Sequence, residues 1–505
     1  MRETKIEQGM LRGLPCADPH ITSYKGIPFA APPLGNLRWH APMPAGKWDG
    51  LLKAYEFAPI SMQPVPGEQN NIYTAEWNVD PDIPISEDCL YLNIWTPANK
   101  AGEKLPVFIW FFGGAFIEGN TREMEFNCER IARRGIVVVT VNYRVNCFGF
   151  LCHPEITAEN PAAPANFGLL DQKAGMEWAK RNIAAFGGDP LNISIGGQSA
   201  GGGSVSAHLT SPQTEGLFVR AIMMSALMLP FYGEGGPRMD RNLSLAEETG
   251  KEFFEFLGVK TLSEARKLDA FFIRDKTKEY RALKMQQGIP FIWGPVSDGK
   301  YLLDNSMKML FENKRKMVPL MAGHTIPEFP YIADFKSMPE LEAFAKKRFD
   351  AQADAFMAAI KGHYFEDTLA KASYNSIELG VKALFRATQK TANPPPCWYY
   401  LFDGDIPGDD NPGGFHSVDL WFWFETLAAS WRPFTGKHYD LARRMCNYMC
   451  NFIKSGNPNG NDQDGSPMPQ WKPYSECDKP FVLSENCWMG TEAEKPVITF
   501  ALANL

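Results

Sequence analysis

One serine enclosed by glycines, Ser199, constrains the fold of this chain more than any other feature. Before it, Leu191, Ile193 and Ile195 alternate with other residues as they do in a β-strand. Residues 197–201 then read Gly-Gln-Ser-Ala-Gly. Glycine permits both a tight turn and the close approach of neighbouring backbone. The segment therefore predicts a strand, a sharp turn that holds Ser199 in a strained conformation, and a helix.

Two interpretations of this turn are possible. A Gly-x-Ser-x-Gly pattern between a strand and a helix is typical of the nucleophile of serine hydrolases. Glycine-rich turns at a helix N-terminus also bind phosphate groups. A phosphate loop of the common nucleotide-binding type has a lysine directly before its hydroxyl residue, and none lies here. We therefore expect the partners of a serine nucleophile elsewhere in the chain.

Charge and hydropathy exclude several classes of partner. The 505 residues carry a net charge of −7, and no basic cluster is longer than Lys314-Arg315-Lys316. This argues against a surface for nucleic acid or acidic lipid, and favours a small neutral partner. The most apolar window, 105–117, contains two glycines and is shorter than the ~18 residues of a membrane span. The charged first residues lack the apolar stretch of a secretory signal, so we expect a cytoplasmic protein.

The ten cysteines form no Cys-x-x-Cys pair and no cluster with histidine at the spacing of zinc ligands. In a long chain without an export signal, buried reduced thiols are expected rather than disulfides. We predict neither a metal ion nor a cofactor.

The order of apolar segments predicts an α/β fold. Two continuously apolar runs, 105–112 and 136–143, suit strands that are buried on both faces of a parallel sheet. The stretch between them, 123–134, has a helical pattern, and a strand, a helix and a second strand form the βαβ unit. Residues 166–183 have helical spacing and lead into the strand before Ser199. This order predicts a doubly wound, mostly parallel central sheet flanked by helices.

Further buried strands are predicted at 318–323 and 398–402. The charged helical stretches of about 240–288 and 338–392 are interpreted as insertions that cap the sheet. Since no linker or repeat separates these segments, we expect a single catalytic domain over residues 1–505.

A serine nucleophile needs a histidine base, a carboxylate that orients the histidine, and donors for an oxyanion. In α/β-hydrolases the chain order is serine, acid, histidine, which leaves as candidate bases His208, His324, His363, His416 and His438. His208 lies on the helix that leads away from Ser199, and the position of His324 suggests a structural role. His416 follows a glycine-rich loop after the strand at 398–402, as expected of a base at the edge of a sheet.

Three carboxylates are candidates for the acid. Glu328 lies past a strand end and between Ser199 and His416 in the chain, but Asp298 and Asp304 satisfy the same order. From the residues alone, these alternatives stay open.

Donors for an oxyanion are predicted from the backbone. The N–H of Ala200 directly follows the nucleophile, and Gly113-Gly114-Ala115 ends the strand at 105–112. We predict an oxyanion hole formed by the N–H of Ala200 together with one or two N–H groups of Gly113-Gly114-Ala115.

These motifs together resemble the type B carboxylesterases, the carboxylesterase/lipase and cholinesterase-like branch of the α/β-hydrolases. The similarity runs along nearly the whole chain, and its most specific segments are Gly26-Ile27-Pro28-Phe29-Ala30, Glu87-Asp88-Cys89-Leu90-Tyr91-Leu92-Asn93, and Phe186-Gly187-Gly188-Asp189-Pro190 followed by the glycines around Ser199. The resemblance implies a bacterial-type intracellular member with an α/β-hydrolase fold. It also implies Ser199 as nucleophile, Glu328 as acid and His416 as base. The oxyanion donors that it implies are the N–H groups of Gly114, Ala115 and Ala200.

The chain departs from the family pattern at five positions. Gln198 stands where the family commonly has Glu, Phe112 where His or Tyr usually precedes the glycines, and Ala115 in place of a third glycine. Around the acid, Thr325 and Phe329 replace the usual Asn and Gly. A backbone donor survives the change from Gly to Ala, so the oxyanion hole is expected to persist.

The expected function is hydrolysis of small to medium apolar carboxylic esters through an acyl-enzyme on Ser199. An amidase or acyl transferase with the same residues, or a non-catalytic binding protein of the same fold, are the alternatives. Phe112, Phe116 and Trp421 are candidates for an apolar substrate pocket. The expected partner is a small-molecule ester, and the expected state is a monomer or weak homo-oligomer.

Overall fold

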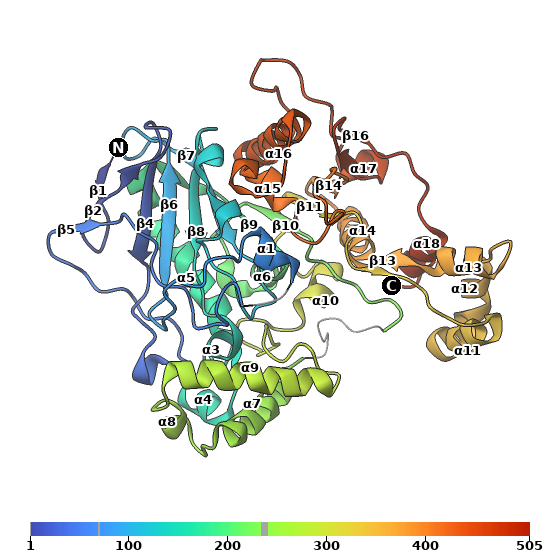
Figure 1. Ribbon diagram of the computed structural model, residues 1–505, viewed down its shortest axis with the longest axis horizontal. Coiled ribbons are helices and arrows are strands. Elements are labelled where there is room, and N and C mark those ends of the chain that lie inside the picture. The colour runs from blue at the N-terminus through green and yellow to red at the C-terminus, as the bar shows by residue number, and fades with distance from the viewer. Residues whose placement is uncertain (1, 69–70, 234–240) are drawn as a thin grey trace.

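The computed structural model describes residues 2–68, 71–233 and 241–505 (Figure 1). Within these ranges a large sheet runs in the order β16-β15-β14-β11-β10-β9-β7-β8-β6-β4-β3. Its strands are β3 Leu14–Pro15, β4 Thr22–Pro28, β6 Tyr91–Thr96, β7 Leu105–Phe111, β8 Val137–Val141, β9 Gly188–Gln198, β10 Arg220–Met224, β11 Leu320–Thr325, β14 Cys397–Phe402, β15 Phe481–Leu483 and β16 Trp488–Met489. Two small sheets join β1 (Glu3–Lys5), β2 (Met10–Arg12) and β5 (Leu51–Lys53), and β12 (Pro330–Tyr331) with β13 (Tyr374–Asn375).

The centre of the large sheet is parallel. Neighbouring strands from β8 to β15 pair in parallel, whereas the pairings among β3, β4, β6 and β8 and between β15 and β16 are antiparallel. The predicted apolar runs correspond to β7, β8, β11 and β14, so the prediction of a mostly parallel sheet is confirmed. Parallel strands end at the same edge of a sheet, so the loops after these strands lie together.

Alternate side chains of β7 enter different cores, as the period of two in a strand requires. Phe108 and Trp110 pack in a cluster with residues of α15 (Leu420–Trp423) and α16 (Gly436–Ser455). Ile109 and Phe111 pack on the other face with α5 (Phe167–Asn182), α6 (Ala200–Thr210) and α14 (Ser376–Gln389). The sheet is therefore covered on both faces, as an α/β fold requires.

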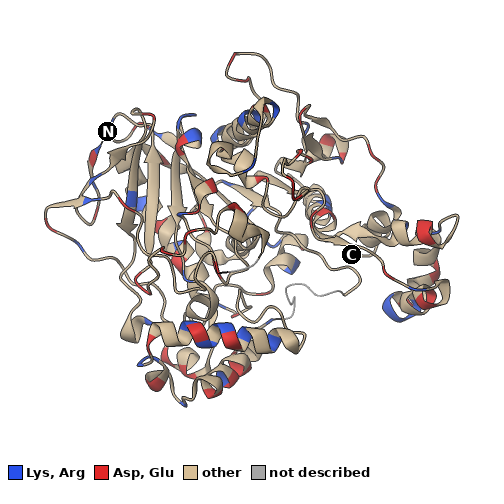
Figure 2. Ribbon diagram, in the orientation of Figure 1, with Lys and Arg blue, Asp and Glu red and all other residues tan. Residues whose placement is uncertain are grey.

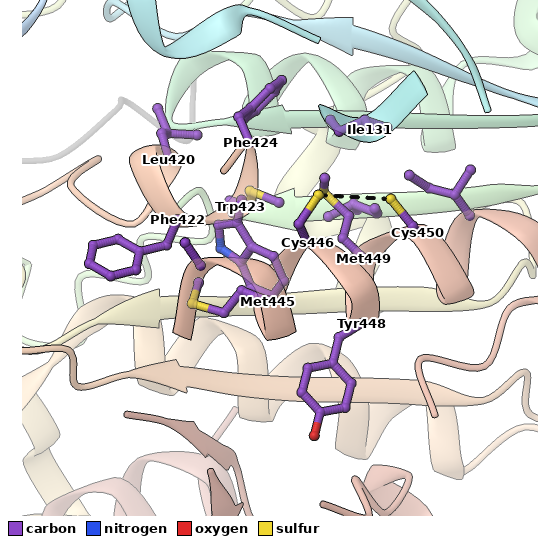
Figure 3. Close-up of a cluster of buried hydrophobic side chains, with 14 of the residues drawn as sticks. Ile131, Leu420, Phe422, Trp423, Phe424, Met445, Cys446, Tyr448, Met449 and Cys450 are labelled. Carbon is purple, nitrogen blue, oxygen red and sulfur yellow. Dashed lines mark hydrogen bonds between the residues drawn. The ribbon is translucent and has the colours of Figure 1, made fainter. Parts of the chain in front are cut away.

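The core around α15 and α16 is dense in aromatic and sulfur-containing side chains (Figure 3). Cys446 and Cys450 lie on the same face of α16 with their sulfur atoms 4.0 Å apart, and all ten cysteines are free thiols. In this core, Trp423 and Phe424 are completely buried.

The helix predicted at 123–134 is wrong. The structure has a 3₁₀ turn at Met124–Phe126 and a single turn, α2, at Glu129–Ala132. Between them Asn127 is extended, and its side chain accepts a hydrogen bond from the N–H of Glu129 at 3.1 Å. This local bond ends one turn and begins the next, because asparagine competes with the helical backbone for its N–H groups.

The first predicted insertion forms a helical layer at one end of the sheet (Figure 1). It contains α7 (Leu243–Leu257), α8 (Leu262–Ala265) and α9 (Ala270–Gln286), which share a separate core. Residue 240, its predicted start, lies outside the described residues. Both basic and acidic residues lie along α9 (Figure 2).

The second predicted insertion contains four helices. α11 (Met338–Phe349), α12 (Ala353–Ala359) and α13 (Phe365–Ala372) pack in their own cluster with α18 (Pro496–Ala503). α14 contacts this cluster through Leu379 and Ala383, and it is buried against the large sheet through Val381 and Leu384. The last helix of the predicted insertion therefore also covers the sheet.

The remaining helices connect these layers: α1 Ile72–Glu76, α3 Asn146–Phe150, α4 Pro154–Glu159, α10 Ser306–Phe311 and α17 Tyr474–Cys477. In the described part of the chain, no helix is both long enough and apolar enough to cross a bilayer.

Candidate active site

Ser199 occupies the sharp turn between β9 and α6. Its backbone has φ 56° and ψ −124°, and its N–H donates to the carbonyl of Met224 at 2.9 Å. A β-carbon on Gly197 would lie 2.3 Å from the backbone of Gly201, and one on Gly201 would lie 2.1 Å from the carbonyl oxygen of Phe111. Both positions therefore require glycine, and the predicted strand, strained turn and helix are confirmed.

The loop after β7 lies against Ser199. A β-carbon on Gly113 would be 3.2 Å from Cβ of Ser199. Gly114 and Ala115 follow with φ 105° and 54°, and their N–H groups donate to no acceptor among the described residues. Ala200 begins α6, where an α-helix leaves its first N–H groups without internal acceptors. The three predicted donors thus belong to two backbone segments that meet beside Ser199 and are free to bind an oxyanion.

Glu328 and His416 form a direct pair. Glu328 lies in the loop after β11, and its completely buried carboxylate accepts a hydrogen bond from His416 Nδ1 through Oε1. Its other oxygen accepts from Ser225 Oγ at 2.8 Å and from the N–H of Thr325 at 2.9 Å. Burial raises the pKa of Glu328, but the charge and hydrogen bond of His416 outweigh burial, so the pKa is lowered overall. Glu328 is therefore a carboxylate at neutral pH.

Thr325 also links the two loops that carry this pair. Its Oγ1 lies 3.1 Å from Glu328 Oε2 and 3.0 Å from the carbonyl oxygen of Gly414, two residues before His416. A hydroxyl thus occupies the position where the family usually has an asparagine, and it keeps hydrogen bonds to both loops.

Gln198 contacts the other nitrogen of His416. Its Nε2 lies 3.2 Å from His416 Nε2, and an amide N–H can donate only to an unprotonated ring nitrogen. This network assigns the imidazole proton to Nδ1, facing Glu328, and leaves a lone pair on Nε2. In the described residues no hydrogen bond joins Ser199 Oγ to His416. The structure therefore brings Glu328 and His416 together, with Gln198 in the place that Ser199 would take.

Two of the competing histidines, His208 and His324, have structural partners. His208 is completely buried and bonds to Tyr301 Oη at 2.7 Å and to Gln172 Oε1 at 2.8 Å. Burial lowers its pKa to about 3, so it stays neutral. His324 lies 3.1 Å from Tyr399 Oη through Nε2 and contacts a backbone carbonyl through Nδ1. The structural role expected for His324 is confirmed.

The competing carboxylates have other partners. Asp298 accepts hydrogen bonds from the N–H groups of residues 300–302 and from Asn166 Nδ2. Asp304 pairs with Lys308 at the surface. Among the three candidates, only Glu328 bonds to a histidine that also contacts Gln198, the residue before Ser199.

In the described part of the protein, no group of three His, Cys, Asp or Glu side chains could hold a metal ion.

Two of the three predicted pocket residues are corrected. Phe112 is 1% exposed and stacks on Tyr143 with 4.2 Å between ring centroids. Trp421 is completely buried, and its Nε1 donates to Glu76 Oε2 at 3.3 Å. Both belong to the core and present no surface to a ligand. Phe116 is half-buried against the start of α6 and remains a candidate.

Sequence reasoning missed two buried groups beside Glu328 and His416. Ser225 directly follows β10 and donates to Glu328. Asp419 accepts hydrogen bonds from Tyr400 Oη and Trp423 Nε1, each at 3.1 Å. Burial and the charge of Glu328 raise the pKa of Asp419 to about 7. Ser225 could have been predicted as a site residue, because it is a polar residue directly after a buried strand and the loops after the neighbouring strands carry the other site residues.

Known proteins share both the sequence and the fold. The profile of the Carboxylesterase family matches residues 2–496. The chain is 32% identical to a fumonisin B1 esterase of Sphingopyxis macrogoltabida over 81% of this chain and 73% of that protein. It is 29% identical to a para-nitrobenzyl esterase of Bacillus subtilis over 87% of each chain.

A solved PNB esterase structure superposes with a TM-score of 0.80, at 26% identity and over 99% of each chain. A carboxylesterase of Geobacillus stearothermophilus has a TM-score of 0.73, at 28% identity over 97% of this chain and 98% of that one. The parallel sheet, the strained serine turn and these matches agree, and the chain belongs to the carboxylesterase family of α/β-hydrolases, a serine hydrolase that cleaves carboxylic esters.

Proposed function

We propose that the protein hydrolyses small to medium apolar esters with Ser199 as nucleophile, His416 as general base and acid, and Glu328 as the group that orients His416. One observation carries this proposal: five neighbouring strands, β7, β9, β10, β11 and β14, end at one edge of the sheet. The loops after these strands carry, in that order, the Gly114-Ala115 donors, Ser199, Ser225, Glu328 and His416.

In the first step, Ser199 Oγ attacks the acyl carbonyl carbon and its proton passes to Nε2 of His416. Nε2 must first exchange its contact with Gln198 for one with Ser199. Such hydrogen bonds often form only when substrate is bound. The carbonyl oxygen becomes negative and accepts the N–H groups of Gly114, Ala115 and Ala200. The anionic carboxylate of Glu328 stabilises the imidazolium that results.

The tetrahedral intermediate then collapses. The bond between the carbonyl carbon and the alcohol oxygen breaks, and His416 gives its proton from Nε2 to the departing alcohol. This leaves an acyl ester on Ser199. Water repeats the attack, again with His416 as base, and releases the acid and free Ser199.

The test is a Ser199→Ala variant assayed with p-nitrophenyl acetate and butyrate. Loss of the nucleophile should lower kcat by several orders of magnitude. An organophosphonate should add covalently to the wild-type protein and not to the variant, as measured by intact mass. Retained turnover in Ser199→Ala, or an adduct on another residue, would overturn the assignment.

The substrate class is tested with a panel. Acyl chains of two to twelve carbons, each as ester and as anilide, would compare chain length and bond type under the same conditions. We expect turnover to peak at short to medium acyl chains and esters to exceed anilides. A preference for anilides would favour the amidase alternative.

We further propose a cytoplasmic location, supported by ten free thiols, and a monomeric or weakly self-associating state, supported by the net charge of −7. Cell fractionation tests the first and sedimentation velocity across a hundredfold concentration range tests the second.

A further inference from the structure

Phe329 is an exposed aromatic residue in a backbone conformation that bulky side chains rarely adopt. It directly follows Glu328 and has φ 39°, in the left-handed region. Burial of its side chain does not compensate for this strain, because the residue is 47% exposed. Its neighbour Glu328 is held firmly, since Asn375 Nδ2 donates to the Glu328 carbonyl at 2.6 Å. Strained residues that persist in this way concentrate at functional sites.

The Phe329 ring lies on His416. The two ring centroids are 4.6 Å apart, and the planes are inclined by 49°. The imidazole edges are occupied by Glu328 at Nδ1 and Gln198 at Nε2. The phenyl ring therefore packs beside an imidazole whose two nitrogens are both engaged, and about half of the residue's surface faces solvent.

The reaction places the alcohol of the substrate on this side of the site. His416 must deliver a proton to the departing alcohol oxygen, so that oxygen has to come within hydrogen-bond distance of Nε2. The carbonyl oxygen points instead to the donors at Gly114, Ala115 and Ala200. A side chain that touches the imidazole ring can therefore contact the alcohol portion.

We propose that Phe329 contacts the alcohol portion of the ester and favours alcohols that carry an aromatic ring over short alkyl alcohols. This inference rests on the proposed roles of Ser199 and His416. An exposed phenyl ring offers an apolar face and a polarised edge, and ring pairs gain free energy beyond the area that they bury.

The experiment compares benzyl acetate with ethyl acetate. Both substrates give the same acetyl-enzyme, so a difference in kcat/KM reports the alcohol portion alone. For Phe329→Ala we expect the ratio of kcat/KM for benzyl over ethyl acetate to fall about fivefold. A change at His416 itself would affect both acetates alike and leave the ratio in place. Phe329→Leu, which keeps apolar bulk without a ring, should fall by an intermediate factor.

Two further variants separate recognition from folding. Phe329→Gly removes the strained side chain, so it should lose the same selectivity with an unchanged or higher melting temperature. Phe271→Ala removes another exposed phenyl ring, 48% exposed on α9, and should leave the ratio unchanged.

The outcomes are distinct. An equal loss on both acetates, or an unchanged ratio in Phe329→Ala and Phe329→Gly, would overturn the inference while the wild type still hydrolyses esters. If the wild type hydrolyses neither acetate, the proposed function fails and the inference fails with it.

Discussion

Replacing Gln198 by glutamate should move the pH profile of the enzyme. Gln198 Nε2 lies 3.2 Å from His416 Nε2, and the residue is 2% exposed. A carboxylate at this position would favour the imidazolium, because opposite charges a few ångströms apart stabilise each other. The general base would then stay protonated, and inactive, up to a higher pH.

The size of the effect follows from the distance. Two unit charges about 4 Å apart interact by about 4 kcal/mol at an effective dielectric constant of 20, and by about 1 kcal/mol in water. Since about 1.4 kcal/mol corresponds to one pH unit, the acid limb of kcat/KM should move up by about 1 to 3 pH units. The cost of burying the new carboxylate reduces the shift towards the lower figure.

The assay is kcat/KM for p-nitrophenyl acetate from pH 4 to 9 in wild type and Gln198→Glu. Gln198→Met, which removes the amide without adding charge, should leave the limb in place. Gln463→Glu adds the same charge at an exposed position and should also leave it, because exposed charges are screened by salt. A limb that stays fixed in Gln198→Glu, or moves to lower pH, would refute the contact between Gln198 and His416.

Three other substitutions test the surroundings of the site. Ser225→Ala removes a hydrogen bond to the buried Glu328 carboxylate. Since hydrogen bonds to charged groups contribute about 1.5–3 kcal/mol, kcat/KM for p-nitrophenyl acetate should fall about tenfold or more. An unchanged kcat/KM would contradict this. Gly201→Ala places a β-carbon 2.1 Å from a backbone oxygen of β7 and should abolish soluble expression, whereas Gly203→Ala meets only a side-chain atom at 3.3 Å and should fold, as judged by circular dichroism. Burial and the charge of Glu328 raise the pKa of Asp419 from 3.8 to about 7, so the folded state binds the extra proton and its free energy of unfolding falls as pH rises through about 4 to 7. In Asp419→Asn the free energy of unfolding, measured with urea, should fall by about 4 kcal/mol less over this range. Parallel curves of this free energy against pH for the two proteins would disprove the prediction.

The fold was predictable where one local pattern suffices. β7 and β8 are continuous apolar runs in the sequence. The glycines at 197 and 201 indicate the tight serine turn, and both are required there for steric reasons. The helix at 123–134 was not predictable, because the side chain of Asn127 interrupts an otherwise helical pattern. Hydrophobic periodicity identifies an apolar face and does not identify its partner, so the sequence did not reveal that α14 covers the sheet as well as packing with α11–α13.

The candidate site was predictable as far as strand order determines it. Strand ends of a parallel sheet converge, so residues as far apart as Ser199 and His416 can be expected at one edge. Which atoms touch there depends on side-chain packing, and the contact between Gln198 and His416 has no signature in the sequence. Aromatic composition likewise does not separate core from pocket: Phe112 and Trp421 are as apolar as a pocket requires, yet both are buried.

Three of the five positions at which this chain departs from the family pattern lie on the proton-transfer side of the site, and the other two, Phe112 and Ala115, lie in the oxyanion loop. Gln198 and Phe329 each contact His416, and Thr325 contacts Glu328. The nucleophile turn keeps its glycines, and the oxyanion loop still offers its N–H groups. Attack on the carbonyl should therefore follow the common course of the family, whereas proton transfer and departure of the alcohol are the steps that these residues can alter. Compared with its relatives, this protein is expected to differ more in pH dependence and alcohol preference than in the rate of attack on the acyl group. Gln198→Glu and Phe329→Gly, which restore the residues usual in the family, should reduce the differences in pH dependence and alcohol preference.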